Sequence, residues 1–349
     1  MEKKITVLIV DDSALVRQLL VDMISQDPEL EVVGIARDGV EAINLTNELA
    51  PDVVTMDIHM PVMDGLSALE YIMKKSPRPV VMLSAFVSKG AAPTLKALEL
   101  GAVDFIAKPS QFPTSVKEVR ECVLDKIKAA ARSRAKEAWE RARRARPPKK
   151  EVKFNSETVR GGKVVVLGAS AGGPRALMEI VPALPEGVPA SIVIVQHMPS
   201  QFTASFADRL NAKARVEVCE ATDGEELLAG VALVAPGGRD MAFEKIGGGK
   251  ARVRLLPTVA RYGASPVIDV TMESAAQVFS ERAVGVLLSG MGNDGAMGLG
   301  MIKDVGGKTI AQNEETCLVY GMPRAAIERG IADEVLPLEK IVEAIVAHL

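Results

Sequence analysis

Aromatic residues are scarce in this sequence: Phe, Tyr and Trp together make up 3% of its 349 residues. Proteins that hold single-stranded nucleic acid usually stack the bases on aromatic side chains, so this mode of binding is disfavoured. Cysteine is scarce too, and Cys122, Cys219 and Cys317 are widely separated and lack the spacing of metal ligands. This use of cysteine is typical of reduced thiols in a cytosolic protein.

A long apolar run is also missing. No stretch approaches the roughly 18 consecutive apolar residues that would span a membrane. The start of the chain leads directly into the strand-like run Ile5–Val10, which is too short for the apolar region of a signal peptide. The formal net charge of −3 gives no general reason to expect a polyanionic partner. We therefore expect a cytoplasmic protein that is not inserted in a membrane and binds no nucleic acid.

What the sequence does contain is regular alternation. Its length suggests two domains, at roughly 150 residues per domain. Within residues 1–125, short β-branched runs alternate with amphipathic segments such as Ala14–Ile24 and Gly39–Glu48. This pattern is typical of βαβ units that build a parallel sheet with helices on both faces. The expected strands are Val7–Val10, Val32–Ala36, Val53–Met56, Val80–Leu83 and Asp104–Ile106.

The segment 126–160 has a different character. Its first part is dominated by Ala, Arg and Lys, and Pro147-Pro148 follow. We interpret it as an extension of the last helix of the first domain that runs into a solvated linker. The alternative is a basic patch that docks on nucleic acid or on an acidic partner.

From residue 161 to 349 the alternation resumes, so the fold class is α/β, with two doubly wound parallel-sheet domains, the second of them Rossmann-like. No repeat relates the second domain to the first. Its expected strands are Val164–Leu167, Ser191–Gln196, Val216–Glu220, Val231–Ala235, Val284–Leu288 and Lys308–Ala311.

Carboxylates follow two expected strands of the first domain. Asp11 and Asp12 come after the first strand, and Asp57 comes after the third. The carboxyl ends of parallel strands share one sheet edge, where three carboxylates repel one another unless a hard cation such as Mg²⁺ lies between them. Ser84 and Lys108 follow later strands, and a hydroxyl and an ammonium there neutralise a transferred phosphoryl group. An Asp after a strand is often only a helix cap, but the five together predict a phosphorylation switch.

The second domain opens with a candidate nucleophile. The run Val164–Leu167 leads into Gly168-Ala169-Ser170-Ala171-Gly172, which matches Gly-x-Ser-x-Gly in a strand–turn–helix setting. The alternative is a glycine-rich turn without chemistry. A hydroxyl nucleophile needs a base, and His197 directly follows the strand run Ser191–Gln196, at the sheet edge expected for Ser170.

The third member of such a triad is a carboxylate at another strand end. Asp294 follows Val284–Leu288, and its rival Asp223 is explained by a simple turn. The order Ser170, His197, Asp294 differs from the Ser, Asp/Glu, His order of α/β-hydrolases, which indicates a convergent triad. Gly290–Gly295 also fits G-x-G-x-x-G, but a carboxylate within that turn would repel a pyrophosphate.

The first domain resembles a response-regulator receiver domain. The matching segments are Val10–Ser13, Met56–Pro61, Met63–Gly65, Leu83–Ala85 and Lys108-Pro109. The resemblance implies that Asp57 is phosphorylated and that Asp11 and Asp12, with Asp57, hold Mg²⁺. It further implies that Ser84 and Lys108 contact the phosphoryl group and that Phe105 is the aromatic switch residue.

The chain as a whole resembles the CheB family of chemotaxis protein-glutamate methylesterases/glutaminases. The matching segments include Leu167–Ser170, Gln196–Pro199, Ala235–Gly238, Gly290–Gly295, Ile310–Asn313 and Gly321–Arg324. The resemblance implies a Ser170, His197 and Asp294 triad that demethylates, and in part deamidates, chemotaxis receptors. It implies oxyanion donors on the backbones of Ala171 and Met291, and a histidine kinase as the phosphodonor. It further implies that phosphorylation of Asp57 relieves a receiver that covers the Ser170 edge.

Three segments depart from the family pattern. Ala171 stands where Thr is common, Arg239-Asp240-Met241 replaces a His-containing segment, and Pro266–Asp269 lacks the usual Ser. These changes affect residues expected to position the substrate. An alternative interpretation is therefore a response regulator whose output domain binds a partner without catalysis. A DNA-binding regulator is disfavoured, because residues 163–349 contain no helix-turn-helix pattern.

Overall fold

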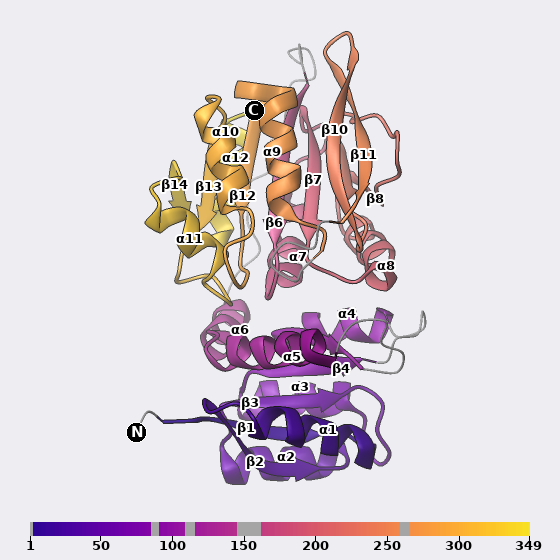
Figure 1. Cartoon of the computed structure of the whole chain (residues 1–349), viewed down its shortest axis with the longest axis vertical. Helices are drawn as coiled ribbons and strands as arrows, with labels where there is room; N and C mark the ends of the chain where they lie inside the picture. The colour runs from indigo at the N-terminus through magenta and orange to yellow at the C-terminus, as the bar shows by residue number, and fades with distance from the viewer. Residues whose placement is uncertain (1–2, 85–90, 109–115, 145–161, 259–264) are drawn as a thin grey trace. The chain divides into compact units, whose positions relative to one another are not determined.

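The computed structural model describes residues 3–84, 91–108, 116–144, 162–258 and 265–349. The chain divides into two compact units, Met1–Ala145 and Arg146–Leu349 (Figure 1). Among the described residues, no helix is long and apolar enough to cross a membrane.

The first unit is built on a five-stranded sheet in the order β2-β1-β3-β4-β5, and its strand pairs are all parallel. Every residue of β3 and β4 is buried, as expected for strands that helices cover on both faces. The strands are β1 (Ile5–Val10), β2 (Leu30–Ala36), β3 (Val53–Asp57), β4 (Val80–Ser84) and β5 (Asp104–Ala107). The helices that follow them in turn are α1 (Ala14–Ser25), α2 (Gly39–Leu49), α3 (Gly65–Lys75), α4 (Ala91–Glu99) and α5 (Val116–Ala131).

The compact first unit extends past residue 125, where the sequence interpretation ended the first domain. Helix α5 runs on to Ala131, and α6 (Ala135–Arg144) follows it within the same unit. The reason is packing: Ile127 and Ala130 are buried, and the ring of Trp139 on α6 lies close to Gly101. The first part of the expected 126–160 linker is therefore helical, and residues 145–161 lie outside the described part of the chain.

The second unit contains a seven-stranded sheet in the order β14-β13-β12-β6-β7-β9-β8, again with parallel neighbours. Its strands are β6 (Lys163–Ala169), β7 (Ala190–Gln196), β8 (Glu217–Glu220), β9 (Val231–Val234), β12 (Ala283–Leu287), β13 (Lys308–Gln312) and β14 (Glu334–Leu336). Its helices are α7 (Gly173–Ala183), α8 (Ser200–Asn211), α9 (Ile268–Phe279), α10 (Ala296–Asp304), α11 (Met322–Glu328) and α12 (Leu338–Ala347), with a short 3₁₀ turn η3 (Ser280–Arg282).

An antiparallel hairpin lies beside this sheet and was not predicted from the sequence. Its strands are β10 (Arg239–Gly247) and β11 (Lys250–Pro257), which pair from Arg239 with Pro257 to Gly247 with Lys250. The inner residues Met241 and Val253 join the core that α9 covers. Figure 1 shows the hairpin as a long two-stranded ribbon, and its strand β10 packs against α9.

The chain order of the strands reverses around β6, which pairs with β12 on one side and β7 on the other. Loops that leave a parallel sheet at such a point form a crevice at the carboxyl ends of the strands. In the first unit β1 has the same position between β2 and β3. Each sheet thus has one edge where loops from neighbouring strands converge.

Candidate functional site

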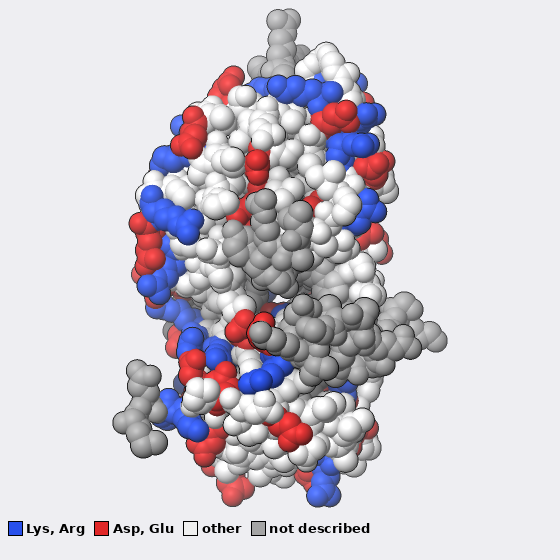
Figure 2. Space-filling view, viewed as in Figure 1, with Lys and Arg blue, Asp and Glu red and all other residues white. Residues whose placement is uncertain are grey.

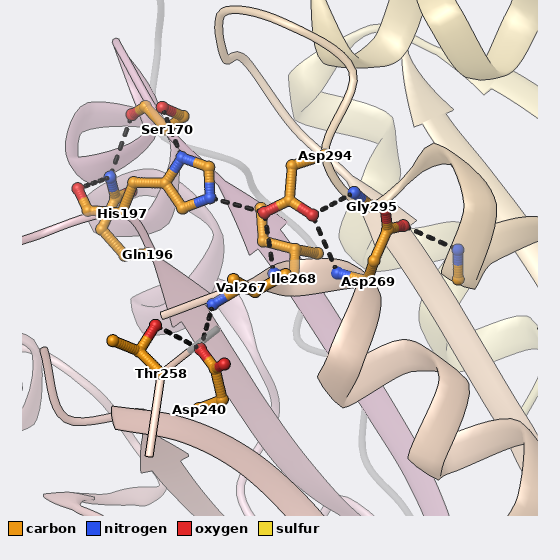
Figure 3. A network of polar contacts seen from close by, with 11 residues as sticks. Ser170, Gln196, His197, Asp240, Thr258, Val267, Ile268, Asp269, Asp294 and Gly295 are labelled. Atoms are coloured by element: carbon orange, nitrogen blue, oxygen red, sulfur yellow. Dashed lines mark hydrogen bonds and ion pairs between the residues drawn. The ribbon is translucent and has the colours of Figure 1, made fainter. Parts of the chain in front are cut away.

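Ser170, His197 and Asp294 come together at the carboxyl ends of the three central strands of the second unit. They follow β6, β7 and β12 respectively. Ser170 Oγ lies 3.0 Å from His197 Nδ1, and His197 Nε2 lies 2.7 Å from Asp294 Oδ2 (Figure 3). The three side chains predicted from separate strand ends therefore form one continuous hydrogen-bonded chain. This is the arrangement of a nucleophile, a general base and a carboxylate that orients the base.

The carboxylate determines which nitrogen of His197 is the base. Asp294 can only accept, so Nε2 carries the proton and donates it to Oδ2. Nδ1 is then the acceptor that faces the hydroxyl of Ser170. The imidazole is thus held in the tautomer that can take the proton of the nucleophile.

Asp294 is itself fixed by the backbone around it. It is 1% exposed, and its oxygens accept hydrogen bonds from the N–H groups of Ile268 (2.8 Å), Asp269 (3.0 Å) and Gly295 (2.9 Å). Two of these donors belong to the first turn of α9, whose N-terminus favours a negative charge. The arrangement holds this buried carboxylate in place and aims it at His197.

The turn that carries Ser170 is a tight one. Gly172 has φ +76°, and a Cβ there would lie 2.5 Å from Leu318 and 2.7 Å from Ser289 Oγ, so only glycine fits. Ser289 holds the same turn, because its carbonyl accepts from Ser170 N (3.0 Å) and its hydroxyl donates to Ala171 O (2.8 Å). The turn thus presents the hydroxyl of Ser170 in a fixed position before α7 begins.

Two backbone N–H groups are available beside the nucleophile. Those of Ala171 and Met291 have no hydrogen-bond partner among the described residues. Ala171 directly follows Ser170, and Met291 lies in the loop between β12 and Asp294. They are the candidates to receive negative charge on a substrate oxygen.

The rival carboxylate lies elsewhere. Asp223 accepts from Leu255 N at 2.8 Å and pairs with Arg254, both on β11. The alternative interpretation of Gly290–Gly295 as a dinucleotide-binding turn is disfavoured, because Asp294 within this turn is hydrogen-bonded to His197. The triad of Ser170, His197 and Asp294 is the interpretation that the contacts favour.

Asp240, which departs from the family pattern, has a structural partner in this region. It is 1% exposed, and its Oδ1 accepts from Val267 N (2.9 Å) and Thr258 Oγ1 (3.2 Å). Val267 directly precedes Ile268, whose N–H binds Asp294 (Figure 3). The carboxylate therefore secures the segment on which the triad rests.

Sequence reasoning missed three further polar residues of this site: Gln196, Asp269 and Ser289. All three are buried and bind backbone groups next to the triad. For Gln196 the available signal was its position directly before His197 at the end of a strand. For the other two, the direction of the side chain depends on the packing of helices and loops that are distant in sequence.

The acidic residues of the first unit also come together. Ligand oxygens of Asp11, Asp12 and Asp57 lie within 4.8 Å of one another. Asp11 and Asp57 are buried, whereas Asp12 is exposed. Mg²⁺ prefers oxygen ligands and is usually bound by a few carboxylates together with water molecules. Carboxylate oxygens at the carboxyl ends of the strands fit such an ion. The donor set therefore fits the metal expected from the sequence.

Lys108 neutralises part of this charge. Its Nζ lies 2.7 Å from Asp11 Oδ2 and 2.7 Å from Asp57 Oδ2. Burial raises the pKa of Asp57, and the hydrogen bond from Lys108 opposes that effect only in part. Burial alone would lower the pKa of Lys108, but its hydrogen bonds to Asp11 and Asp57 outweigh it, so the pKa of Lys108 is raised. Lys108 is therefore a cation beside the candidate phosphorylation site.

The other two residues predicted around this site lie on neighbouring strands. Ser84 ends β4, is 1% exposed and shares a hydrogen bond of 2.7 Å with Thr94. Phe105 on β5 is buried beneath Lys126, whose Nζ lies 5.2 Å from the centre of the ring. Their roles in phosphoryl contact and switching remain predictions.

Charges of both signs alternate on the face drawn in Figure 2, and the described residues of that face form no continuous basic area. In the second unit several charged residues are paired, as Arg252 is with Glu244 and Lys250 is with Glu226.

Comparisons with known proteins identify the families of both units. Residues 165–345 match the family model "CheB methylesterase", and residues 7–120 match "Response regulator receiver domain". A protein-glutamate methylesterase/protein-glutamine glutaminase of Carboxydothermus hydrogenoformans is 50% identical over 98% of each chain, and one of Pyrococcus abyssi is 48% identical over 99% of this chain and 93% of its own. The crystal structure of the Thermotoga maritima CheB methylesterase catalytic domain matches with a TM-score of 0.53 and 43% identity, over 54% of this chain and 100% of that one.

Proposed function

Because this chain belongs to the CheB family of protein-glutamate methylesterases and protein-glutamine glutaminases, we propose that Ser170, His197 and Asp294 are its catalytic residues. The observation that carries the assignment is the continuous chain of hydrogen bonds from Ser170 Oγ through His197 to Asp294. The substrates are glutamyl methyl esters, and certain glutamines, on methyl-accepting chemotaxis receptors.

In the first half of the reaction, Ser170 Oγ attacks the side-chain carbonyl of the substrate while Nδ1 of His197 takes its proton. The carbonyl oxygen becomes an oxyanion that binds the N–H groups of Ala171 and Met291, each worth about 2.7–4 kcal/mol in comparable sites. The C–O or C–N bond to the leaving group then breaks. His197 returns the proton, so methanol leaves an ester and ammonia leaves a glutamine.

In the second half, a water molecule takes the place of the leaving group. His197 removes its proton as it attacks the ester formed on Ser170, and returns the proton to Ser170 Oγ when that bond breaks. The product is a glutamate carboxylate in either case. Asp294 stabilises the imidazolium each time it forms, and its three backbone donors keep it in position.

The first unit is a receiver that controls this activity. Asp57 is the phosphoacceptor, and the histidine kinase of the chemotaxis system is the phosphodonor. Asp11, Asp12 and Asp57 hold Mg²⁺, which supplies charge neutralisation for the phosphoryl group when it is bound. Lys108 pairs with the same carboxylates, while Ser84 contacts the phosphoryl group and Phe105 responds to it.

The test is product release from receptor membranes that carry either glutamyl methyl esters or glutamines. Wild-type protein with Mg²⁺ and a phosphodonor should release methanol from the first and ammonia from the second. Ser170→Ala should release neither, whereas Ser200→Ala, a matched change at the exposed first residue of α8, should release both. Release by Ser170→Ala at the wild-type rate would rule out this nucleophile.

A further inference from the structure

Gln196 is a buried polar residue for which the proposed reaction gives no role. It is the last residue of β7, directly before His197, and is 2% exposed. In the β6–β7 register it pairs with Ala169, the residue before Ser170. Its side chain therefore starts between the strand that delivers the nucleophile and the strand that delivers the base.

The amide of Gln196 joins these two segments. Its Nε2 donates to the carbonyl of Ser170 and to the carbonyl of His197, both at 3.0 Å. The backbone bond from His197 N to Ala169 O, at 3.1 Å, belongs to the ladder of the same two strands. The side chain continues this ladder past the point where β6 turns into the loop that carries Ser170.

The orientation of the amide is fixed by its surroundings. If its oxygen and nitrogen were exchanged, the oxygen would face two carbonyl oxygens, so the two hydrogen bonds define the assignment. Oε1 is packed against the start of α7, where a Cβ on Gly173 would lie 2.3 Å from it. Oε1 is buried and has no hydrogen-bond partner among the described residues.

We propose that Gln196 is a positioning residue, which fixes the main chains of Ser170 and His197 and so holds Oγ within reach of Nδ1. It donates to carbonyl groups only and does not face the reacting atoms. The inference rests on the proposed esterase activity and adds the hydrogen bonds that align two of its three catalytic residues. Because proton transfer depends on the Oγ–Nδ1 geometry, loss of these hydrogen bonds should lower kcat.

A structural role and a positioning role can be separated with Gln196→Met. Methionine fills a similar volume without donors, and it also removes the unpaired Oε1 acceptor. Ser170 O keeps the hydrogen bond from Gly173 N at 2.7 Å. The variant should therefore fold with little loss of stability, while it loses the two hydrogen bonds that connect the segments of Ser170 and His197.

The matched control is Thr309→Val. Thr309 is fully buried at the opposite end of the same sheet, and its hydroxyl donates to Ile331 O (2.8 Å) and lies 2.9 Å from Asp333. The control thus removes a buried donor of the second unit without touching the site. The unfolding temperature of Thr309→Val should fall at least as far below that of wild type as the unfolding temperature of Gln196→Met does.

The measurement is kcat and KM for methanol release by the full chain with Mg²⁺ and phosphodonor. In Gln196→Met we expect kcat to fall about 10- to 100-fold, with KM within about twofold of wild type. Thr309→Val should keep both. Phosphonylation of Ser170 by a small serine-directed reagent, which needs no receptor binding, should slow to a similar extent in Gln196→Met and in the shorter Gln196→Leu.

Wild-type kcat in both Gln196 variants, or a loss no larger than that of Thr309→Val, would overturn the inference. An inactive wild type would count against the proposed function instead. In that case the phosphonylation rates still decide the role of Gln196.

Discussion

Asp294 accepts four hydrogen bonds through two oxygens, three from backbone N–H groups and one from His197. An asparagine of the same shape would direct an N–H₂ group at one or more of these donors. Where that group faces His197, it selects the other tautomer, in which the nitrogen beside Ser170 carries a proton and cannot act as a base.

We therefore predict that Asp294→Asn lowers kcat by about 10⁴-fold, as such a change does in other serine hydrolases. The control is Asp223→Asn, the carboxylate that competed for this role in the sequence, which pairs with Arg254 instead. Its kcat should stay within about twofold of wild type. Equal effects in the two variants would contradict the assignment of Asp294.

The residues that could be predicted from sequence are those at the carboxyl ends of strands or directly after them. Ser170, His197, Asp11 and Asp57 needed only the rule that parallel strands end at one edge. Gln196 could not be found in this way, because its role depends on a side chain reaching sideways to two carbonyl groups. The same sequence rule gives the position of a residue but not the direction of its side chain.

At the scale of elements, helices α9 and α10 cap each other. Neither has a capping side chain at its own N-cap residue, Val267 or Gly295. Asp294, just before α10, accepts from the first N–H groups of α9, and Asp269 in α9 accepts from Gly298 N of α10 at 2.7 Å. The carboxylate that we propose orients His197 is thus part of the joint between two helices.

Replacing Asp269 by alanine should loosen that joint. We predict a local destabilisation of about 1 kcal/mol, the usual value for a lost N-cap. Amide hydrogen exchange across α10, measured by mass spectrometry on the full chain, should then rise about fivefold, and kcat should fall. Asp304→Ala, an exposed change at the other end of α10, is the control and should change neither. Unchanged exchange in Asp269→Ala would refute reciprocal capping.

Helix α5 is tied to the first unit by ion pairs. Nζ of Lys128 lies 2.7 Å from Asp27 Oδ2 and 2.9 Å from Glu29 Oε1. Burial by itself raises the pKa of Asp27, but its hydrogen bonds to Lys128 and the backbone outweigh this and lower it. The pKa of Lys128 is raised, mainly by its hydrogen bond to Asp27. The contribution of Asp27 to stability is full above its ordinary value of 3.8 and is lost as the pH falls through its lowered value.

Lys128→Met should accordingly lower the free energy of unfolding of the first unit by about 0.2–1 kcal/mol at pH 7. The loss should be the same at pH 5 and should shrink only below the ordinary pKa values of the two partners of Lys128, which are 4.5 for Glu29 and 3.8 for Asp27. Trp139, the one tryptophan of the chain, lies in this unit, so its fluorescence during urea unfolding reports the change. Lys74→Met, which breaks an exposed pair with Glu70, should cost less. A pH-independent loss down to pH 2 would show that the pairing with Asp27 is not its cause.

The alternation of strands and helices was enough to predict two parallel sheets, and the structure confirms this fold class. The hairpin β10–β11 escaped prediction because its outer residues are charged and because Gly247, at the end of β10, leads into a turn of two more glycines, Gly248-Gly249. Only the packing of its inner face on α9 makes it part of the core. Elements of this kind depend on tertiary contacts more than on local pattern.

At the scale of the whole molecule, one chain contains a receiver and an esterase, and phosphorylation of the first controls the second. Asp57→Asn removes the proposed phosphoacceptor and one of the three carboxylates of the candidate Mg²⁺ site. With a phosphodonor present, its methanol release should equal that of wild type without the donor. Asp22→Asn, an exposed change on α1, should respond to the donor as wild type does.

The measurement that tests the central claim most directly is methanol release from methylated receptor membranes by wild type, Asp57→Asn and Ser170→Ala, each with and without phosphodonor and Mg²⁺. We predict release that rises with phosphodonor in wild type only, a low and constant rate in Asp57→Asn, and none in Ser170→Ala under either condition. Stimulation that persists in Asp57→Asn, or release that persists in Ser170→Ala, would contradict the account.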